Sequence, residues 1–428
     1  MHRPGVGQHA LRIACVLACV NCWLLCGCSP TARSPQVAQA LRDYELGRFD
    51  VAYAALAPLA EKKDENFVLN NARLGSIALA DYNLAMAESA FYRAYEVINS
   101  VNVNDPGRAL AALALSEEAK IWKGEPYERA MVNFYLGIVY YMQKDYQNAR
   151  AAFENALFKL RDYAEGAKSR DEFQERESDF TIGYLMLAKS WQFLGKPERA
   201  KPYFESLARL RPELTQLADE QRHAYSNVLL LVEFGDGPEK ILGGDNSVVL
   251  IRPTPAEAGP IPRPQVYVDG KAQNLRGLNV PPIDMLELAQ QRRWQTFDTI
   301  RVMKSVAAMG MLGGAAYSAH RGDDAAAIGL ALGALALKAT ATADTRYWEM
   351  IPRTMFIIPL ELPPGKHDIT VSFGRRYEQT WRDIVAPESG ESAYYFRITG
   401  TNPGPFTWPP PHLASEQVDG NQRVSRTE

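Results

Sequence analysis

One pattern of small and large residues recurs along the first half of the chain, and this self-similarity constrains the fold more than any other feature. It is clearest in the stretches "ERAMVNFYLGIVYYMQKDYQNARAAFENAL" (128–157) and "TIGYLMLAKSWQFLGKPERAKPYFESLARLRP" (181–212). Residues 36–215 show almost none of the apolar–polar alternation that is typical of strands. The pattern therefore predicts stacked helical hairpins, because each hairpin buries its apolar face only against its neighbours.

The spacing resembles the tetratricopeptide repeat, and weaker copies start near residues 44 and 70. In this pattern small residues let two helices approach closely, and large residues fill the space between successive hairpins. The packing residues that we assign on this basis are Gly75, Ala87, Phe91, Gly137, Tyr140, Ala149, Phe153, Ala188, Trp191, Ala200 and Phe204. The resemblance implies a helical repeat domain over residues 36–220, with a concave surface that holds a peptide or a partner protein. Taken alone, the assigned aromatic residues indicate only a packed core.

Past residue 222 the sequence changes to short β-branched and aromatic runs separated by Gly, Pro and Asp-Gly turns. We expect strands at 227–235, 247–253, 264–271, 354–362, 367–373 and 393–399. The pieces "VYVDGK" and "LELPPGKHDITVSFG" resemble the two halves of a PEGA-type module, a small β-sandwich of surface proteins. The expected fold class is therefore α+β: a helical repeat domain followed by a β-sandwich-like domain over 221–400.

A Gly/Ala-rich segment at 283–342 interrupts the second domain and has the composition of helices. Gly329 and Gly333 have the small-xxx-small spacing that permits close contact between helices. Lys304 and the "RGDD" turn break the apolar run, which argues against a complete membrane span. Two interpretations stay open, a helical pair packed on the protein or a partner, and a hairpin that enters the membrane. Residues 401–428 are Pro-rich and then polar, and we expect a disordered tail there.

All five cysteines of the chain lie between residues 15 and 28, at the end of an N-terminal apolar run. Basic residues, a short apolar stretch and small residues follow one another there, as in a secretory signal. The sequence "LCGC" that closes the run resembles the bacterial lipobox, and this resemblance implies a signal peptide over 1–27, a lipid on Cys28 and a linker over 28–35. An uncleaved anchor helix is the alternative. A metal or iron–sulfur cluster is disfavoured, because its ligands would lie inside an export signal.

Composition and motifs argue against nucleic-acid binding and against catalysis. The 47 basic and 50 acidic residues give a net charge of −3, which offers no basic surface for nucleic acid. After residue 28 the histidines are His223, His320, His367 and His412, and no pair of them has the spacing of a metal site. We expect no enzyme activity, no metal and no cofactor. The most specific polar motif is Asp344, Arg346 and Trp348, either a ligand contact or an ion pair and stacked indole that fix the following strand.

Two stretches, "KGEPYERAMVNFYLGIVYYMQKDYQNARAAF" (123–153) and "ADTRYWEMIPRTMFIIPLELPPGKH" (343–367), resemble a family of bacterial outer-membrane lipoproteins that have no established activity. The resemblance implies a lipid-anchored protein on the periplasmic face of the outer membrane. From these features we expect a scaffold that binds a periplasmic or outer-membrane protein through its repeats, in cell-envelope assembly. The alternatives are a glycan- or peptidoglycan-binding lipoprotein, and a component of a pore or export complex that uses the Gly/Ala-rich insertion.

Overall fold

The computed structural model describes the main body of the chain, in segments whose bounds follow. They are residues 34–100, 121–122, 124–160, 178–223, 226–243, 248–253, 259–290, 345–374 and 377–398, with short strands at 162–163, 175–176 and 406–407. The signal and Cys28, Asp344, nearly all of the Gly/Ala-rich insertion and the tail beyond 407 lie outside these residues.

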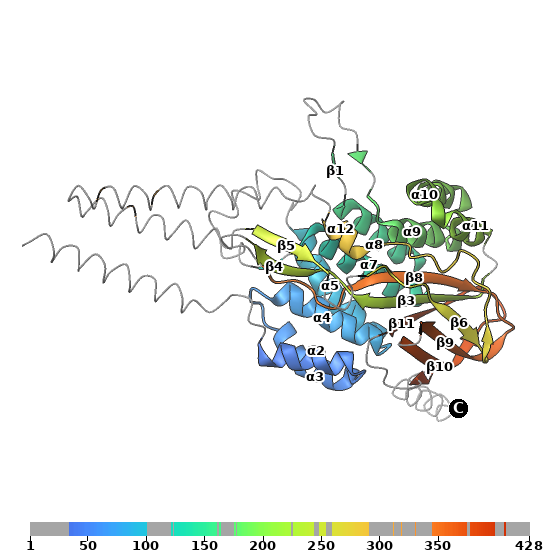
Figure 1. Ribbon diagram of the computed structural model, residues 1–428, viewed down its shortest axis with the longest axis horizontal. Helices are drawn as coiled ribbons and strands as arrows, with labels where there is room; N and C mark the ends of the chain where they lie inside the picture. The colour runs from blue at the N-terminus through green and yellow to red at the C-terminus, as the bar shows by residue number, and fades with distance from the viewer. Residues whose placement is uncertain are drawn as a thin grey trace, which may run out of the picture.

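Within the described segments, the first half forms four helical hairpins that stack in chain order, as the repeat pattern predicts (Figure 1). The hairpins are α2 (Pro35–Glu45) with α3 (Phe49–Ala60), α4 (Phe67–Ala80) with α5 (Leu84–Ser100), α7 (Pro126–Met142) with α8 (Tyr146–Lys159), and α9 (Thr181–Phe193) with α10 (Pro197–Leu210). A short turn, η3 (Pro212–Leu214), and α11 (Thr215–His223) follow the last hairpin. The pair β1 (Asp162–Tyr163) and β2 (Glu175–Arg176) lies between α8 and α9.

Glycine sets the distance between the two helices of the middle hairpins. A Cβ atom on Gly75 of α4 would lie 2.7 Å from the ring of Phe91 of α5. On Gly137 of α7 it would lie 2.6 Å from the ring of Phe153 of α8. Both rings are completely buried. The helices of these hairpins therefore approach closely because the glycine leaves room for the aromatic ring opposite it.

The described residues of the second half form two sheets, a hairpin and a short helix. One sheet has the order β11 (Ser392–Ile398), β3 (Val228–Asp236) and β8 (Pro352–Leu360), in which β11 runs parallel to β3 and β8 runs antiparallel. The other sheet has the order β12 (Phe406–Thr407), β10 (Tyr377–Ala386), β9 (Gly365–Phe373), β6 (Gln265–Val268) and β7 (Lys271–Ala272). The hairpin is β4 (Glu239–Gly243) with β5 (Val248–Arg252), and the helix is α12 (Met285–Gln290).

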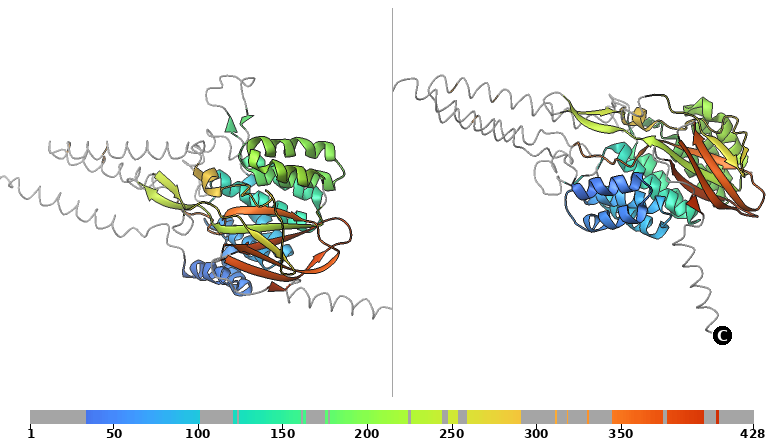
Figure 2. Two further views of the ribbon diagram at one scale, coloured as in Figure 1. Left: turned by 45° about the vertical axis from the view of Figure 1, so that its right-hand side comes forward. Right: turned by 60° about the horizontal axis from the view of Figure 1, so that its bottom comes forward.

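Strand β3 is buried on both faces, which makes the three-stranded sheet the middle of three layers. Leu229 and Leu231 belong to the core shared with the helices. Leu230 and Val232, which alternate with them, belong to the core shared with the five-stranded sheet. The helices accordingly cover one side of the strands in Figure 1 and in both views of Figure 2. Burial on both faces explains why β3 is a continuous apolar run instead of an alternating one.

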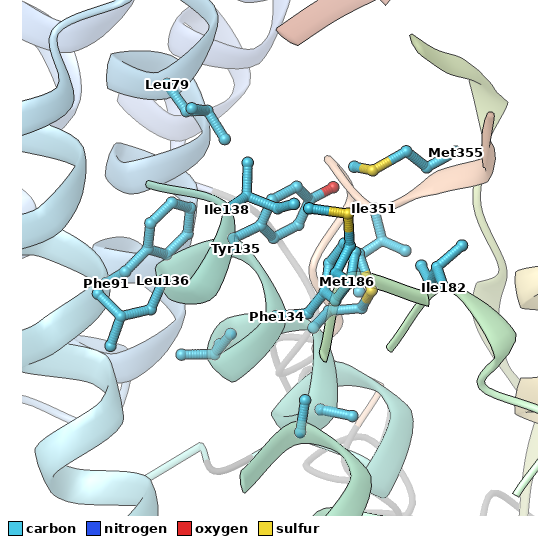
Figure 3. Packing of buried hydrophobic residues seen from close by; sticks show 14 of the residues in the cluster. Leu79, Phe91, Phe134, Tyr135, Leu136, Ile138, Ile182, Met186, Ile351 and Met355 are labelled. Atoms are coloured by element: carbon cyan, nitrogen blue, oxygen red, sulfur yellow. The ribbon is translucent and has the colours of Figure 1, made fainter. Parts of the chain in front are cut away.

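The helical array and the three-stranded sheet share one hydrophobic core, so the two regions of the sequence are not separate packing units. Tyr135 of α7 lies between Phe91 of α5 and Met355 of β8 in Figure 3. The first helices of the last three hairpins, α4, α7 and α9, are buried around almost their whole circumference. By contrast, α10 buries only one face, formed by Ala200, Phe204 and Leu207. The array surface that the repeat resemblance assigns to a partner therefore holds the chain's own three-stranded sheet.

Candidate functional site

Buried ionic groups hold the sheet against the helices, and the first of them is Glu128 in the first turn of α7. Its carboxylate is fully buried and accepts from Lys240 Nζ at 2.7 Å. It also accepts from the backbone N–H groups of Trp348, at 2.8 Å, and Glu125, at 2.7 Å. Burial raises the pKa of Glu128, and the nearby Lys240 ammonium opposes part of that rise. This one side chain thus joins α7, β4 and the segment before β8.

A second buried group, Glu391 beside β11, connects the last two hairpins to the sheet. Lys189 of α9 donates to its carboxylate at 2.9 Å, and the side chains of this pair are 1% and 2% exposed. The Tyr141 hydroxyl of α7 donates at 2.8 Å and the Ser226 hydroxyl at 3.0 Å. A buried carboxylate with this many donors is satisfied. Losing Lys189 would leave its charge uncompensated in the interior, and losing either hydroxyl would leave it short of a hydrogen bond.

A third group, Glu233 of β3, points from the sheet into the array. It accepts hydrogen bonds from the hydroxyls of Tyr135 on α7 and of Tyr395 on β11, the latter at 2.6 Å. Arg397, directly opposite Glu233 in the ladder, lies 3.5 Å from the carboxylate. Burial raises the pKa of Glu233, and Arg397 counteracts that rise. These three ionic groups explain how polar side chains are accommodated in a groove filled by a sheet.

A cleft of about 790 Å³ opens where the array, β4 and the segment before β8 meet. Ser34, Asn66 and Arg73 line it from the helical side, and Glu239, Lys240 and Thr345 line it from the strand side. In the described part of the chain β4 pairs with β5 alone, and Glu239, Lys240 and Ile241 of β4 face this cleft. The buried hydroxyl of Thr345 has no hydrogen-bond partner among the described residues. The cleft therefore contains an unused side-chain hydroxyl and runs beside a strand that pairs with β5 alone in the described chain.

The predicted polar motif lies at this cleft. Arg346 donates to the backbone carbonyl of Glu65 at 2.8 Å and to Asn66 Oδ1 at 3.1 Å. Its own carbonyl accepts from Trp122 Nε1 at 3.0 Å. Trp348 lies behind the cleft wall, fully buried, with its ring centroid 5.4 Å from that of Tyr135. Arg346 thus shapes the cleft directly and Trp348 supports it, while Asp344 is outside the described residues.

An ion pair that no sequence pattern indicated forms another part of the cleft wall. Arg73 of α4 donates to both oxygens of Glu349, with Nε–Oε2 at 2.8 Å and Nη2–Oε1 at 2.7 Å. The signal that could have indicated Arg73 is a single charge inside the apolar helix "FVLNNARLGSIALA". Its partner is 276 positions away in sequence, so no local pattern connects the two.

The assigned packing residues lie between and within the hairpins. Completely or almost completely buried are Ala87, Phe91, Ala149, Phe153, Ala188, Ala200 and Phe204. Trp191 is 7% exposed and Tyr140 is half-buried. His367 lies near the start of β9, where its Nδ1 is 2.8 Å from Asp269 Oδ2 and its Nε2 is 2.8 Å from the carbonyl of Pro363. His223 lies at the exposed end of α11.

The residues that the structure describes contain neither a metal cluster nor a membrane-spanning helix. Within them, no group of three or more His, Cys, Asp or Glu side chains is arranged to hold a metal ion. None of the helices in the same segments combines the length and apolar character needed to cross a membrane.

No family model matches the chain, and no curated protein matches it. Among solved structures, the crystal structure of MamA is 15% identical, with a TM-score of 0.28, over 43% of this chain and 84% of MamA. The thermophilic TPR protein TTC0263 of Thermus thermophilus is also 15% identical, with a TM-score of 0.21, over 44% of this chain and 96% of that protein. The α+β architecture, with tetratricopeptide-like hairpins followed by sheets, stands on the helices and strands described above.

Proposed function

We propose that this protein is a non-enzymatic, lipid-anchored scaffold of the cell envelope that binds a segment of a partner protein in the cleft between α4, β4 and residues 345–349. The observation that carries the proposal is that the chain's own three-stranded sheet fills the groove of the helical array. Because the three-stranded sheet covers the array, a partner has to bind elsewhere, and the cleft is a concave site that both the repeats and the strands line.

The chemistry of the cleft suits an extended peptide. Its volume lies within the range of about 300–1,000 Å³ that is usual for ligand sites. An extended segment beside β4 would pair with the backbone of Glu239–Ile241, and strand addition of this kind provides affinity through main-chain hydrogen bonds. The Thr345 hydroxyl would supply an additional polar contact. Bidentate pairing of Arg73 with Glu349 keeps the wall rigid, which lowers the ordering cost on binding.

Site-specific photo-crosslinking in the native cell tests the cleft. A benzophenone amino acid replaces Tyr347, which lines the cleft, or Tyr92, which is 45% exposed on α5 and serves as the matched control. We expect a discrete adduct with one protein from position 347 and none from position 92. The proposal is contradicted if the variant at position 347 is folded and gives no adduct while the variant at position 92 gives one.

The lipid anchor and the outer-membrane location complete the proposal. Ser34 lines the cleft, and a fully extended linker over residues 28–33 spans roughly 20 Å. A lipid on Cys28 would therefore hold the cleft close to the membrane surface and favour a membrane-proximal partner. Metabolic labelling with a palmitate analogue should mark the parent and not Cys28→Ser. Equal labelling of the two proteins, or recovery of the parent outside the outer-membrane fraction, contradicts this part.

One observation favours a second candidate function, membrane insertion in a pore or export complex. The chain emerges from the Gly/Ala-rich insertion at Thr345, in the same cleft as Ser34, which follows the proposed anchor. The Gly/Ala-rich insertion would then leave the folded part of the protein on the side that the lipid anchor holds against the membrane. Alkaline carbonate extraction of a Cys28→Ser protein with a replaced signal distinguishes the two functions. Retention in the membrane supports insertion, and release supports the scaffold alone.

A further inference from the structure

Three cationic side chains surround the indole of Trp191, at the turn between α9 and α10. The guanidinium carbons of Arg150 and Arg199 each lie 4.9 Å from the ring centroid. The Lys196 ammonium lies 5.5 Å from the same centroid. Arg150 comes from α8 of the preceding hairpin, so the cluster joins two repeats. We call Arg150, Trp191, Lys196 and Arg199 the cationic cluster.

The positive charge of the cationic cluster is only partly compensated. Arg150 pairs with Glu154 at 2.7 Å. Lys196 and Arg199 are exposed, and neither has a carboxylate partner among the residues that the structure describes. Lys201 on the same helix does have one, Glu205 at 3.7 Å. Lys196 and Arg199 stand three positions apart at the start of α10, where like charges repel one another unless an anion lies between them.

Two hydrogen-bond donors in the cationic cluster are also unsatisfied. The indole Nε1 of Trp191 and the Nε of Arg150 are both buried, and within the described chain neither has an acceptor. Packing of one tryptophan against its neighbours requires neither three cations nor unpaired donors. Excess positive charge and unused donors at one place are the features of an anion-binding site.

We propose that the cationic cluster binds a phosphate-type oxyanion, with Lys196 and Arg199 as its direct contacts and Arg150 as an inner positive charge. A compact tetrahedral group suits the two exposed contacts, because Lys196 caps α10 and Arg199 lies three positions further on, which is the spacing of neighbours on one helix face. Guanidinium groups bind phosphate oxygens in pairs, and lysine adds a point charge. The site is separate from the cleft and does not depend on the scaffold function. Its phosphate could be a free ion or part of a lipid headgroup.

Calorimetric titration with inorganic phosphate, against chloride at equal ionic strength, tests the site in the full chain carrying Cys28→Ser. The test variant is Lys196→Ala/Arg199→Ala. The control is Lys201→Ala/Arg209→Ala, which removes the same charge from the same helix. We expect at least tenfold weaker phosphate binding in the test variant and less than a twofold change in the control. Melting temperatures equal to that of the parent establish that the variants are folded.

Sedimentation with vesicles identifies the source of the phosphate. Phosphatidylcholine vesicles with and without phosphatidic acid are compared, using the same variants. Binding that requires phosphatidic acid and is lost in the test variant alone indicates a lipid headgroup, whereas phosphate binding without vesicle binding indicates a free ion. Equal loss in both variants, or no binding of phosphate and of vesicles by the parent, overturns the proposal.

Discussion

Replacing Lys240 by methionine removes one partner of a buried ion pair while largely retaining the volume of the side chain. In the parent the side chain of Lys240 is 2% exposed and that of Glu128 is not exposed at all. Breaking such a pair costs about 3–5 kcal/mol, because the remaining charge is buried without compensation. Glu128 keeps its two backbone donors, from Glu125 and Trp348. We therefore expect a loss at the lower end, about 3 kcal/mol.

The loss should depend on pH in a direction that the burial of Glu128 fixes. Burial raises the pKa of this carboxyl above its ordinary value of 4.5, and Lys240 opposes the rise. Without Lys240 the folded pKa rises further above the unfolded value, so the folded variant binds the proton more tightly than the unfolded chain does. The variant is therefore penalised least at low pH, and the penalty grows as pH rises through the interval from about 4.5 to the new folded pKa.

Urea denaturation followed by circular dichroism, at about pH 5 and pH 8, measures both effects. Arg252→Met is the matched control, because the Arg252–Glu239 pair on the same hairpin is 52% and 27% exposed and should contribute at most about 1 kcal/mol. Lys240→Met/Glu128→Gln should recover most of the loss, since the amide oxygen still accepts from the backbone. A Lys240→Met loss no larger than that of the control, or one equal at both pH values, refutes the explanation.

Three further substitutions test other parts of the structure. Gly137→Ala places a Cβ atom 2.6 Å from the buried Phe153 ring, so a loss of about 1–3 kcal/mol should lower the melting temperature and Phe153→Leu should restore part of it; an unchanged temperature contradicts the packing argument. Tyr135→Phe removes a donor to the buried Glu233 and should cost about 1–3 kcal/mol in urea denaturation, whereas the exposed Tyr92→Phe should cost nothing measurable; equal values for the two would show that the hydroxyl contributes little. Burial lowers the pKa of His367, but its hydrogen bonds to Asp269 and to the Pro363 carbonyl outweigh this effect and raise the pKa above 6.5, so its contribution is complete below pH 6.5 and is lost as pH rises through the folded pKa. Because Asp269 is 52% exposed, that contribution is at most about 1 kcal/mol, and a pH profile of melting temperature identical to that of His367→Gln would rule it out.

Local sequence patterns predicted those helices and strands whose signal lies within a short stretch of the chain. The hairpins follow from small and aromatic residues at fixed spacing, as at Gly75 and Phe91. The six expected strands correspond to β3, β5, β6, β8, β9 and β11. Strand β10 was not predicted, because a shift in register between Trp381 and Ile384 interrupts its alternation. The hairpin partner β4 was missed as well.

The cleft could not be predicted from the sequence, because its walls come from three distant parts of the chain. Residues 34–73, 239–241 and 345–349 meet only after the sheet has packed on the array. The motif of Arg346 and Trp348 could be singled out from the sequence, but nothing in it indicates that Lys240 lies beside them. Lys240 donates to the carbonyl of Arg346 at 3.2 Å, a contact between residues 106 positions apart.

The first helices of the hairpins contain the information that the groove is filled. An array that binds an external partner in its groove has to keep polar residues on the groove side of these helices, so that the empty groove is stable in water. Here α4 buries every residue from Val68 to Leu79, and α9 every residue from Thr181 to Trp191. A helix that is apolar or buried all round needs cover on every side. In a chain with tetratricopeptide-like spacing, such first helices beside one-sided second helices such as α10 therefore predict that another part of the same chain occupies the groove.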